Sequence, residues 1–256
     1  DDADELIDYV PEEEEELYLL YKLMNLRRNW RKRNGSREIN ESQGKVKVEE
    51  DRPYIEIIEP TPSRKLISEC MILYGYIISK FTNINKIPVP YRIQDSIKNE
   101  SINSGSENTI MNNYLLKKTM GKTYYSPQCL KHNSLGLDSY THSSSPIRRY
   151  ADLLIHYQII NFMNNKKLIN MNDMTKLINN INRYSKQNIN KYREDQKEWL
   201  MKWFQVNEAK FYKCVLLSWI NLKKKIVILY FTDYYFSQIC ILKSKNDINS
   251  GDAINI

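Results

Sequence analysis

The sequence is poor in the residues that build metal clusters, disulfide frameworks and flexible linkers. It has four Cys and three His, and no two Cys form a C-x-x-C pair. This spacing excludes the common structural zinc sites and a disulfide framework, so we interpret the four thiols as isolated and reduced. With only 7 Gly and 8 Pro among 256 residues, collagen-like and linker-type chains are excluded as well.

Long apolar runs and a leader are also missing. No run approaches the roughly 18 apolar residues that a membrane-spanning helix needs, and the mean hydropathy is −0.61. We therefore expect no integral membrane protein and no membrane partner. The first residue is Asp rather than Met, and no basic-then-apolar segment follows. We expect a fragment or a processed piece that carries no signal peptide.

Acidic charge is unevenly distributed along the chain. Residues 1–20 hold ten of the 31 acidic side chains and no basic one. The other 236 residues therefore combine 38 basic with 21 acidic side chains, a net charge of +17. Such a body attracts polyanions, most often nucleic acid. A bias of the genome toward Lys codons explains the same charge, so the charge alone leaves both interpretations open.

The hydrophobic pattern predicts an α+β protein. We expect a helix from the Glu-rich segment after Pro11 to the stop at Gly35, a strand over 54–58 and a buried helix that begins at Ser63. The stretch between the first helix and that strand is polar, and residues 95–108 are interpreted as a loop.

The C-terminal half changes from helices to strands. Helices are expected over about 108–120, from Pro146 and over 173–206. Strands are expected over 214–217, 225–230 and 236–242, and a last short one follows the turn at 251–252.

The sharpest pattern is GLDSYTHSSSPIRRYADL, residues 136–153. Ser145 is a good helix N-cap and Pro146 fits the first helical position. Arg148 and Arg149 would then lie in the first turn, where their charge opposes the helix dipole. A bound anion would offset that cost. From the residues alone, an anion site and a pair of salt-bridged surface arginines both remain possible.

The segment from Tyr140 to His156 resembles the signature of the RNB family of exoribonucleases, the ribonuclease II and ribonuclease R type. The family string is close to Y-x-x-x-T-S-P-I-R-R-Y-x-D-L-x-x-H. Further segments resemble the family in the same order, and their spacing suits the cyanobacterial and plastid subtype. These segments are 30–33, 66–73, 87–92 and 125–137.

The resemblance extends over essentially 1–200 and implies the domain organisation. Residues 1–206 would be the C-terminal part of an RNB catalytic domain, with helices around a small mixed sheet. Residues 207–256 would be a small β-barrel of the oligonucleotide-binding (OB) type.

The resemblance also implies an activity. Family members degrade single-stranded RNA processively from its 3′ end to nucleoside 5′-monophosphates, with Mg²⁺ activating the attacking water. The alternative is an RNA-binding protein of the same fold that has lost catalysis. The family's metal-binding Asp cluster lies upstream of everything in this chain, so we assign no metal ligand here and expect the chain alone to be inactive.

Several site residues follow from the matched positions. Arg148 is expected to contact the scissile phosphate and support the transition state, and Arg149 to contact the RNA backbone or to stabilise the structure. Glu69 matches a Glu near the 3′-terminal ribose; an ordinary surface Glu is the alternative.

Four further positions are candidate contacts. Ser145 and Tyr140 are expected to line the phosphate path. His132 is a candidate RNA contact, as is His142, although single His residues are more often structural.

The compartment stays open. The AT-rich codon bias and the plastid-like subtype suggest an apicomplexan parasite, with an intracellular location in the nucleus, the apicoplast or the cytoplasm. Protein partners and RNA targets are not evident from the sequence.

Overall fold

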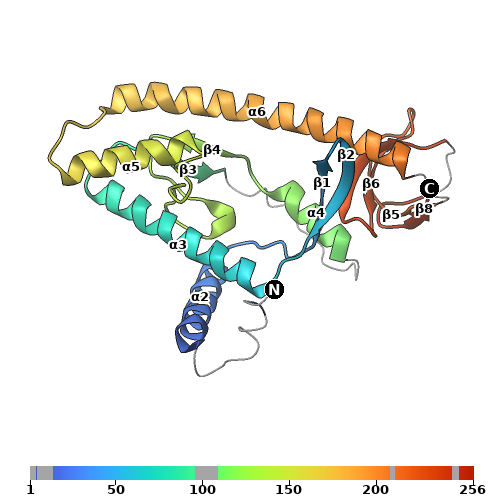
Figure 1. Cartoon of the computed structure of the whole chain (residues 1–256), viewed down its shortest axis with the longest axis horizontal. Helices are drawn as coiled ribbons and strands as arrows, with labels where there is room; N and C mark the ends of the chain where they lie inside the picture. Colours follow the sequence, from blue (N-terminus) through green and yellow to red (C-terminus); the bar gives the residue numbers. More distant parts are fainter. Residues whose placement is uncertain (1–3, 5–13, 96–108, 208–210, 244–247) are drawn as a thin grey trace. The chain divides into compact units, whose positions relative to one another are not determined.

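The computed structural model of the chain describes residues 4, 14–95, 109–207, 211–243 and 248–256 (Figure 1). Most of the expected loop 95–108 and most of the acidic run 1–16 lie outside these residues. Among the described helices, none is long and apolar enough to cross a membrane.

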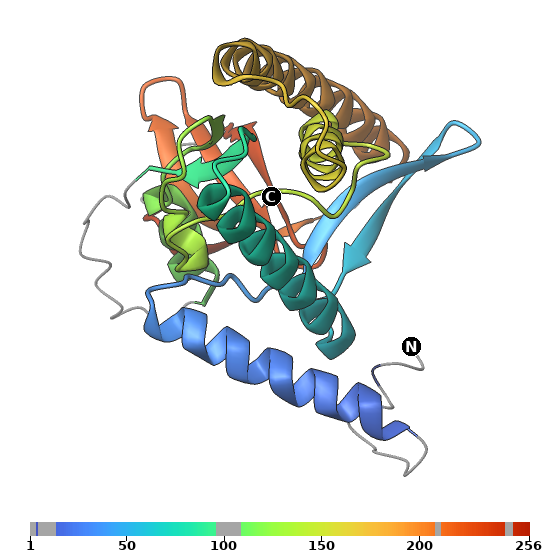
Figure 2. The ribbon, with the colours of Figure 1, turned by 90° about the vertical axis from the view of Figure 1, so that its left-hand side faces the viewer.

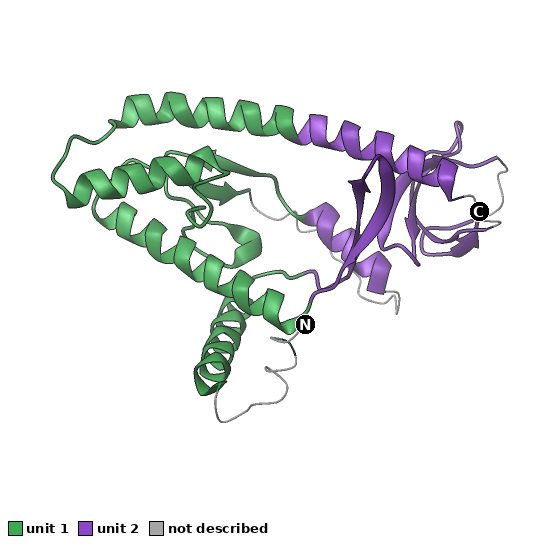
Figure 3. Ribbon diagram, viewed as in Figure 1, with its two compact units in different colours: residues 1–38, 61–99, 120–188 green, residues 39–60, 100–119, 189–256 purple. Residues whose placement is uncertain are grey.

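Two compact units make up the structure, and each is assembled from separated stretches of the chain (Figure 3). Unit 1 comprises residues 1–38, 61–99 and 120–188, and unit 2 comprises 39–60, 100–119 and 189–256. Helix α6 contributes to both. These compact units differ from the two domains expected from the sequence, and the expected domain boundary between residues 206 and 207 stays a prediction.

Unit 1 is mainly helical. Its α2 and α3 are packed neighbours (Figure 2), and its two-stranded sheet pairs β3 with β4 antiparallel. Its elements are α2 (Glu15–Arg33), α3 (Pro62–Ile84), β3 (Tyr91–Gln94), β4 (Thr123–Ser126), the short 3-10 helix η2 (Asn133–Leu135), α5 (Tyr150–Met163) and the first half of α6 (Met171–Val206).

The helix ends follow the chemistry of the sequence. Helix α2 has Glu in its first turn and three basic residues in its last, which suits the helix dipole. Gly35 follows it with φ +86°. Helix α3 begins one residue earlier than expected, because Thr61 is its N-cap and Pro62 occupies the first turn.

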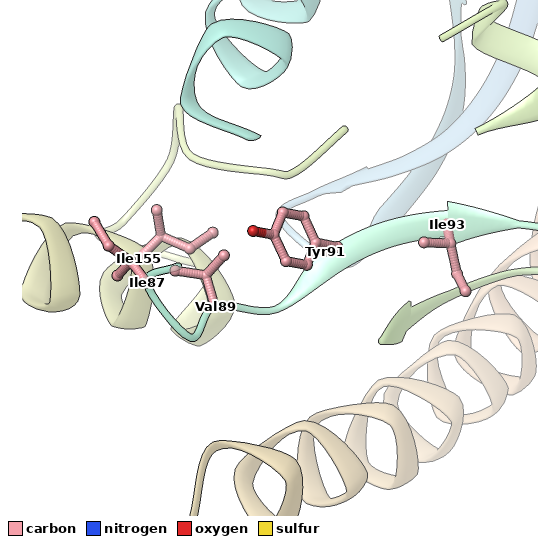
Figure 4. Packing of buried hydrophobic residues seen from close by; sticks show 5 residues of the cluster. All are labelled: Ile87, Val89, Tyr91, Ile93 and Ile155. Carbon is pink, nitrogen blue, oxygen red and sulfur yellow. The ribbon is translucent and has the colours of Figure 1, made fainter. Parts of the chain in front are cut away.

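A small apolar core holds the β3 region of unit 1. Ile87, Val89, Tyr91 and Ile93 lie along one segment, and Ile155 of α5 joins them (Figure 4). All five are buried, so the segment before β3 is tied to the helix that follows the signature.

Unit 2 is built on an antiparallel sheet with the order β7-β6-β5-β8. Phe231 of its core packs against the ring of Phe204 in the C-terminal part of α6, with centroids 5.4 Å apart. Closure of this sheet into a barrel stays a prediction, while the α+β class is confirmed. The elements are β1 (Gln43–Glu49), β2 (Arg52–Ile58), α4 (Thr109–Thr119), β5 (Lys213–Asn221), β6 (Ile226–Phe231), β7 (Phe236–Ile241), β8 (Ala253–Asn255) and the second half of α6.

Strand β1 was not expected from the sequence. It pairs with β2 in a hairpin whose register runs from Gln43 opposite Ile58 to Glu49 opposite Arg52. Glu50 and Asp51 both have positive φ, the requirement of a two-residue type I′ turn. The alternation of Lys and Val over residues 45–48 was the signal, but its Lys content made the stretch resemble a loop.

Helix α5 corrects an expectation that bears on the site. It begins at Tyr150, not at Pro146, and residue Arg149 before it is extended, with φ −122° and ψ 113°. Ser145 is therefore not the N-cap, and neither Arg148 nor Arg149 lies in a first helical turn. The buried carboxylate of Asp152 explains the difference, because it accepts hydrogen bonds from Ser145 and Arg149, the two ends of the segment 145–149.

Candidate functional site

The segment Ser145–Arg149 forms a closed turn before α5. The backbone N–H groups of Arg148 and Arg149 both donate to the carbonyl oxygen of Ser145, at 3.2 and 3.0 Å. The N–H of Ser145 donates to Oδ2 of Asp152 at 2.9 Å. Backbone bonds therefore define the path of the chain through both arginines.

The two arginines differ in their surroundings. Nε and Nη2 of Arg149 donate to the carboxylate of Asp152, with distances of 2.7 to 3.0 Å. Arg148 is exposed, and no hydrogen bond or ion pair joins its guanidinium to another described residue, although its backbone N–H is bonded to Ser145. The arrangement leaves the guanidinium of Arg148 available for an anion, while that of Arg149 already has one.

Both arginines line a cavity of about 540 Å³ within unit 1. Its walls combine two cations, three phenol rings and several amide or hydroxyl groups, a set that suits a nucleotide. The lining residues are Tyr125, Arg148, Arg149, Tyr150, Ala151, Leu177, Asn180, Ile181, Tyr184, Ser185 and Asn188.

A row of aromatic rings supports this cavity from the interior. His132 packs edge-on against Tyr140, and Tyr140 against His142, each with ring centroids 5.5 Å apart. Next in the row is Tyr125, whose hydroxyl lies 2.8 Å from Nδ1 of His142. The guanidinium of Arg92 lies over the ring of Tyr125, 4.8 Å from its centroid. Edge-to-face packing of this kind holds rings in defined orientations.

Burial decides the charge of this row. It lowers the pKa of both His132 and His142 to about 4, with the nearby arginines adding to the effect. Burial also raises the pKa of Tyr140 to about 12. Near pH 7 the row is therefore neutral, and the positive charge of the site comes from its arginines.

Two groups near the signature are buried and unpaired within the described residues. They are Nδ1 of His132 and the hydroxyl of Ser143. His132 is thus an interior residue, although its role as an RNA contact stays a prediction.

Glu69 lies in a different cluster of unit 1. It is 3% exposed and forms a bidentate pair with Arg31, with the shortest contact 2.5 Å. Nη1 of Arg31 also donates to the carbonyl of Leu135 at 3.1 Å. The alternative of an ordinary surface Glu is wrong because the side chain is buried. The expected contact with the terminal ribose stays a prediction.

Glycine is required where this cluster meets the segment before the signature. Gly136 has φ +65°, and a Cβ there would lie 2.6 Å from the carbonyl oxygen of Arg31. The Leu-Gly-Leu string of the sequence therefore reflects a close backbone approach.

The structure brings six of the seven expected site residues into one region: His132, Tyr140, His142, Ser145, Arg148 and Arg149. Sequence reasoning missed Asp152 and Arg92. The spacing of Asp152, three residues after Arg149, was a usable signal for an ion pair. Nothing in the local sequence around Arg92 pointed to its contact with Tyr125.

Metal ligands do not gather in the described part of the chain. No group of three or more His, Cys, Asp or Glu side chains there could hold a metal ion. The described residues therefore do not fit a metal centre.

A comparison with protein families matches the RNB domain over residues 1–165, well over half of the chain. An uncharacterized ribonuclease of Synechocystis sp. is 28% identical over 226 residues, which cover 86% of this chain and 34% of that protein. Ribonuclease II, chloroplastic/mitochondrial, of Arabidopsis thaliana is 32% identical over 170 residues, 63% of this chain and 21% of that protein. These relatives confirm the resemblance to the cyanobacterial and plastid subtype.

Among solved structures, Mycoplasma genitalium RNase R in complex with ribose methylated single-stranded RNA aligns with a TM-score of 0.77 and 18% identity. The alignment covers 93% of this chain and 46% of that one, and it supports the fold. The chain thus spans about a third or less of the length of the two curated relatives named above.

Proposed function

The chain belongs to the RNB-domain family, and from this membership and the site geometry we propose that it is part of a 3′-to-5′ exoribonuclease. Its substrate would be single-stranded RNA, and its products nucleoside 5′-monophosphates. The observation that carries the proposal is Arg148, an exposed guanidinium at the rim of a cavity rich in phenol and amide groups.

The chemistry of Arg148 suits phosphoryl transfer. A guanidinium donates in a planar fork that matches two phosphate oxygens. Charge builds on those oxygens in the transition state, so a pre-positioned cation lowers the barrier. In the proposal Arg148 contacts the scissile phosphate, while Ser145 and Tyr140 border the path of the RNA backbone.

Arg149 and His132 would act less directly on RNA than Arg148. Arg149 could reach the RNA backbone only with the part of its guanidinium that does not bind Asp152. His132 and Tyr140 are equally buried and pack edge-on, so in the proposal His132 supports Tyr140 and does not itself touch RNA.

Magnesium enters the proposal only from outside the chain. The described residues hold no cluster of metal-binding side chains, so in the proposal they do not coordinate the metal. Mg²⁺ would activate the attacking water from ligands elsewhere in the protein. We therefore expect the 256-residue chain alone to show little or no magnesium-dependent RNA decay.

The RNA complex of the M. genitalium structure supports the choice of substrate, because the same fold there binds single-stranded RNA. The net charge of residues 21–256 favours the same partner. A catalytically inactive RNA-binding protein is the alternative, and it predicts the same affinity without turnover.

The test is RNA decay by the full-length protein. A 5′-labelled single-stranded RNA should shorten progressively from its 3′ end, release nucleoside 5′-monophosphates and stop when EDTA is added. Binding of the same RNA with no shortening in the presence of Mg²⁺ would contradict the proposal and establish the inactive alternative.

A further inference from the structure

We propose that Asp152 is a positioning residue that holds Arg148 at the cavity through Arg149 and the turn before α5. This inference rests on the proposed function and adds to it a division of labour between the two arginines. Arg148 would act on the RNA, whereas Arg149 would serve mainly as the partner of Asp152.

The burial of Asp152 is the first observation. Its side chain is 0% exposed, although it carries a carboxylate. A buried carboxylate is stable only when hydrogen bonds and an opposite charge replace its water. Asp152 has both, because it accepts from the backbone N–H of Ser145 and from two nitrogens of Arg149.

The second observation is where these partners lie. Ser145 begins the turn and Arg149 ends it, and Asp152 lies three residues further on, in the first turn of α5. A single rigid carboxylate therefore binds both ends of a five-residue segment. Arg148 lies inside this segment, and its own N–H is held by the carbonyl of Ser145.

The third observation is that helix packing fixes Asp152 itself. Its neighbours Ala151 and Leu154 are buried in a cluster with Met174 and Ile178 of α6. The turn is thus anchored, through Asp152, to the packed apolar interior of unit 1, which moves less than an exposed loop. Because the backbone of Arg148 is already ordered by this turn, Arg148 loses little conformational entropy when RNA binds.

The contacts explain why this position favours a carboxylate over an amide. The side chain of Asn has one carbonyl oxygen, which can accept from Ser145 but leaves Arg149 opposite an uncharged NH₂ group. We expect Asp152→Asn to loosen the turn without removing any group that touches RNA.

The experiment is a mutant cycle in the full-length protein that combines Asp152→Asn with Arg148→Ala. Asp152→Asn alone should lower kcat for single-stranded RNA about 10- to 100-fold, while the Kd for RNA changes by less than about threefold. In the Arg148→Ala background the same substitution should change kcat by less than about twofold, because the group it positions is gone. Equal effects in both backgrounds would overturn the proposal.

Two further variants keep the result interpretable. Asp173→Asn is the matched control, because Asp173 also lies in the first turn of a helix but is exposed; its kcat should be unchanged. If Asp152→Asn does not fold, Arg149→Lys takes its place in the cycle, since it keeps the charge and loses the bidentate contact.

The outcomes separate this inference from the proposed function. Normal turnover in Arg148→Ala would remove the role of Arg148 itself. A loss of turnover in Arg148→Ala combined with normal turnover in Asp152→Asn would leave the proposed function standing and overturn only the role of Asp152.

Discussion

The two units have different interiors. Of the fourteen buried polar or charged residues in the described part of the chain, thirteen belong to unit 1, and only Thr119 belongs to unit 2. The core of unit 2 consists of residues such as Leu216, Val227 and Leu229. Buried polar groups are costly unless they are fully paired. In unit 1, therefore, buried polar residues that hold each other in a defined geometry replace part of the apolar packing. Such a replacement is expected at a functional site.

This comparison predicts that single changes act through different physics in the two units. In unit 1 a lost partner leaves a buried charge or an unpaired polar atom. In unit 2 a lost side chain leaves a cavity. The first kind of damage should depend on pH where a titrating group such as His132 or His142 is involved, and the second should not.

The largest expected effect on stability is in the Arg31–Glu69 pair of unit 1. Glu69→Ala removes the bidentate partner of the buried Arg31 guanidinium, which keeps only a longer contact with Glu38 at 3.5 Å and its bond to the carbonyl of Leu135. This loss should lower the free energy of unfolding by up to about 3–5 kcal/mol. Urea denaturation of the chain, followed by circular dichroism, measures this loss. A loss below about 1 kcal/mol would show that the pair is not buried in solution.

The core of unit 2 should respond to truncation alone. Leu229 is fully buried and lies on β6, the strand between β5 and β7. Leu229→Ala should therefore lower the free energy of unfolding by about 2–4 kcal/mol. The same denaturation experiment at pH 7 and at pH 5 should give equal losses. A loss that changes with pH would contradict the apolar description of this unit.

Acid should weaken unit 1 through His132 and His142. Burial lowers the pKa of each ring to about 4, below the usual value near 6.5. The folded state therefore favours the neutral rings. Their contribution to the free energy of unfolding is fully present above about pH 6.5 and is lost as the pH falls toward 4. The loss should be on the order of 2 kcal/mol for each ring.

Hydrogen exchange between pH 7 and pH 4.5 can locate this effect. Backbone amides of β4 and of the segment 132–142 should lose protection, corrected for the intrinsic rate, more than those of β5 and β6. His142→Gln should reduce the difference. Equal losses in both units would indicate that the two histidines are not responsible.

The smallest effect is expected for an exposed ion pair of unit 2. Lys117 pairs with Glu41, but its side chain is about half exposed. Lys117→Ala should therefore change the free energy of unfolding by less than about 1 kcal/mol. This variant is also the matched comparison for Glu69→Ala, since both remove one member of an ion pair.

Much of the fold could be predicted from local pattern. Helices α2 and α3 and the strands of unit 2 other than β1 were expected, because periodicity and end signals lie within the segments themselves. The start of α5 was wrong by four residues. Ser145 and Pro146 are good starting residues, but the buried contacts of Asp152 with Ser145 and Arg149 stabilise a turn there instead.

The site could be predicted only as far as its signature extends. The resemblance located Arg148 and its neighbours along one short segment. It did not show that Glu69 pairs with Arg31, 38 residues away in the sequence, or that Arg92 lies over Tyr125. Such contacts are set by tertiary packing, and one sequence carries no local signal for them.

The most direct test of the whole account is the turnover of single-stranded RNA by full-length Arg148→Ala, measured beside its RNA affinity. The guanidinium of Arg148 bonds to no other described residue, and the backbone bond of Arg148 to Ser145 does not depend on the side chain, so Arg148→Ala should leave the fold intact. We expect kcat to fall about 10²- to 10³-fold and the Kd to change less than about threefold. Normal turnover in this variant would contradict the account.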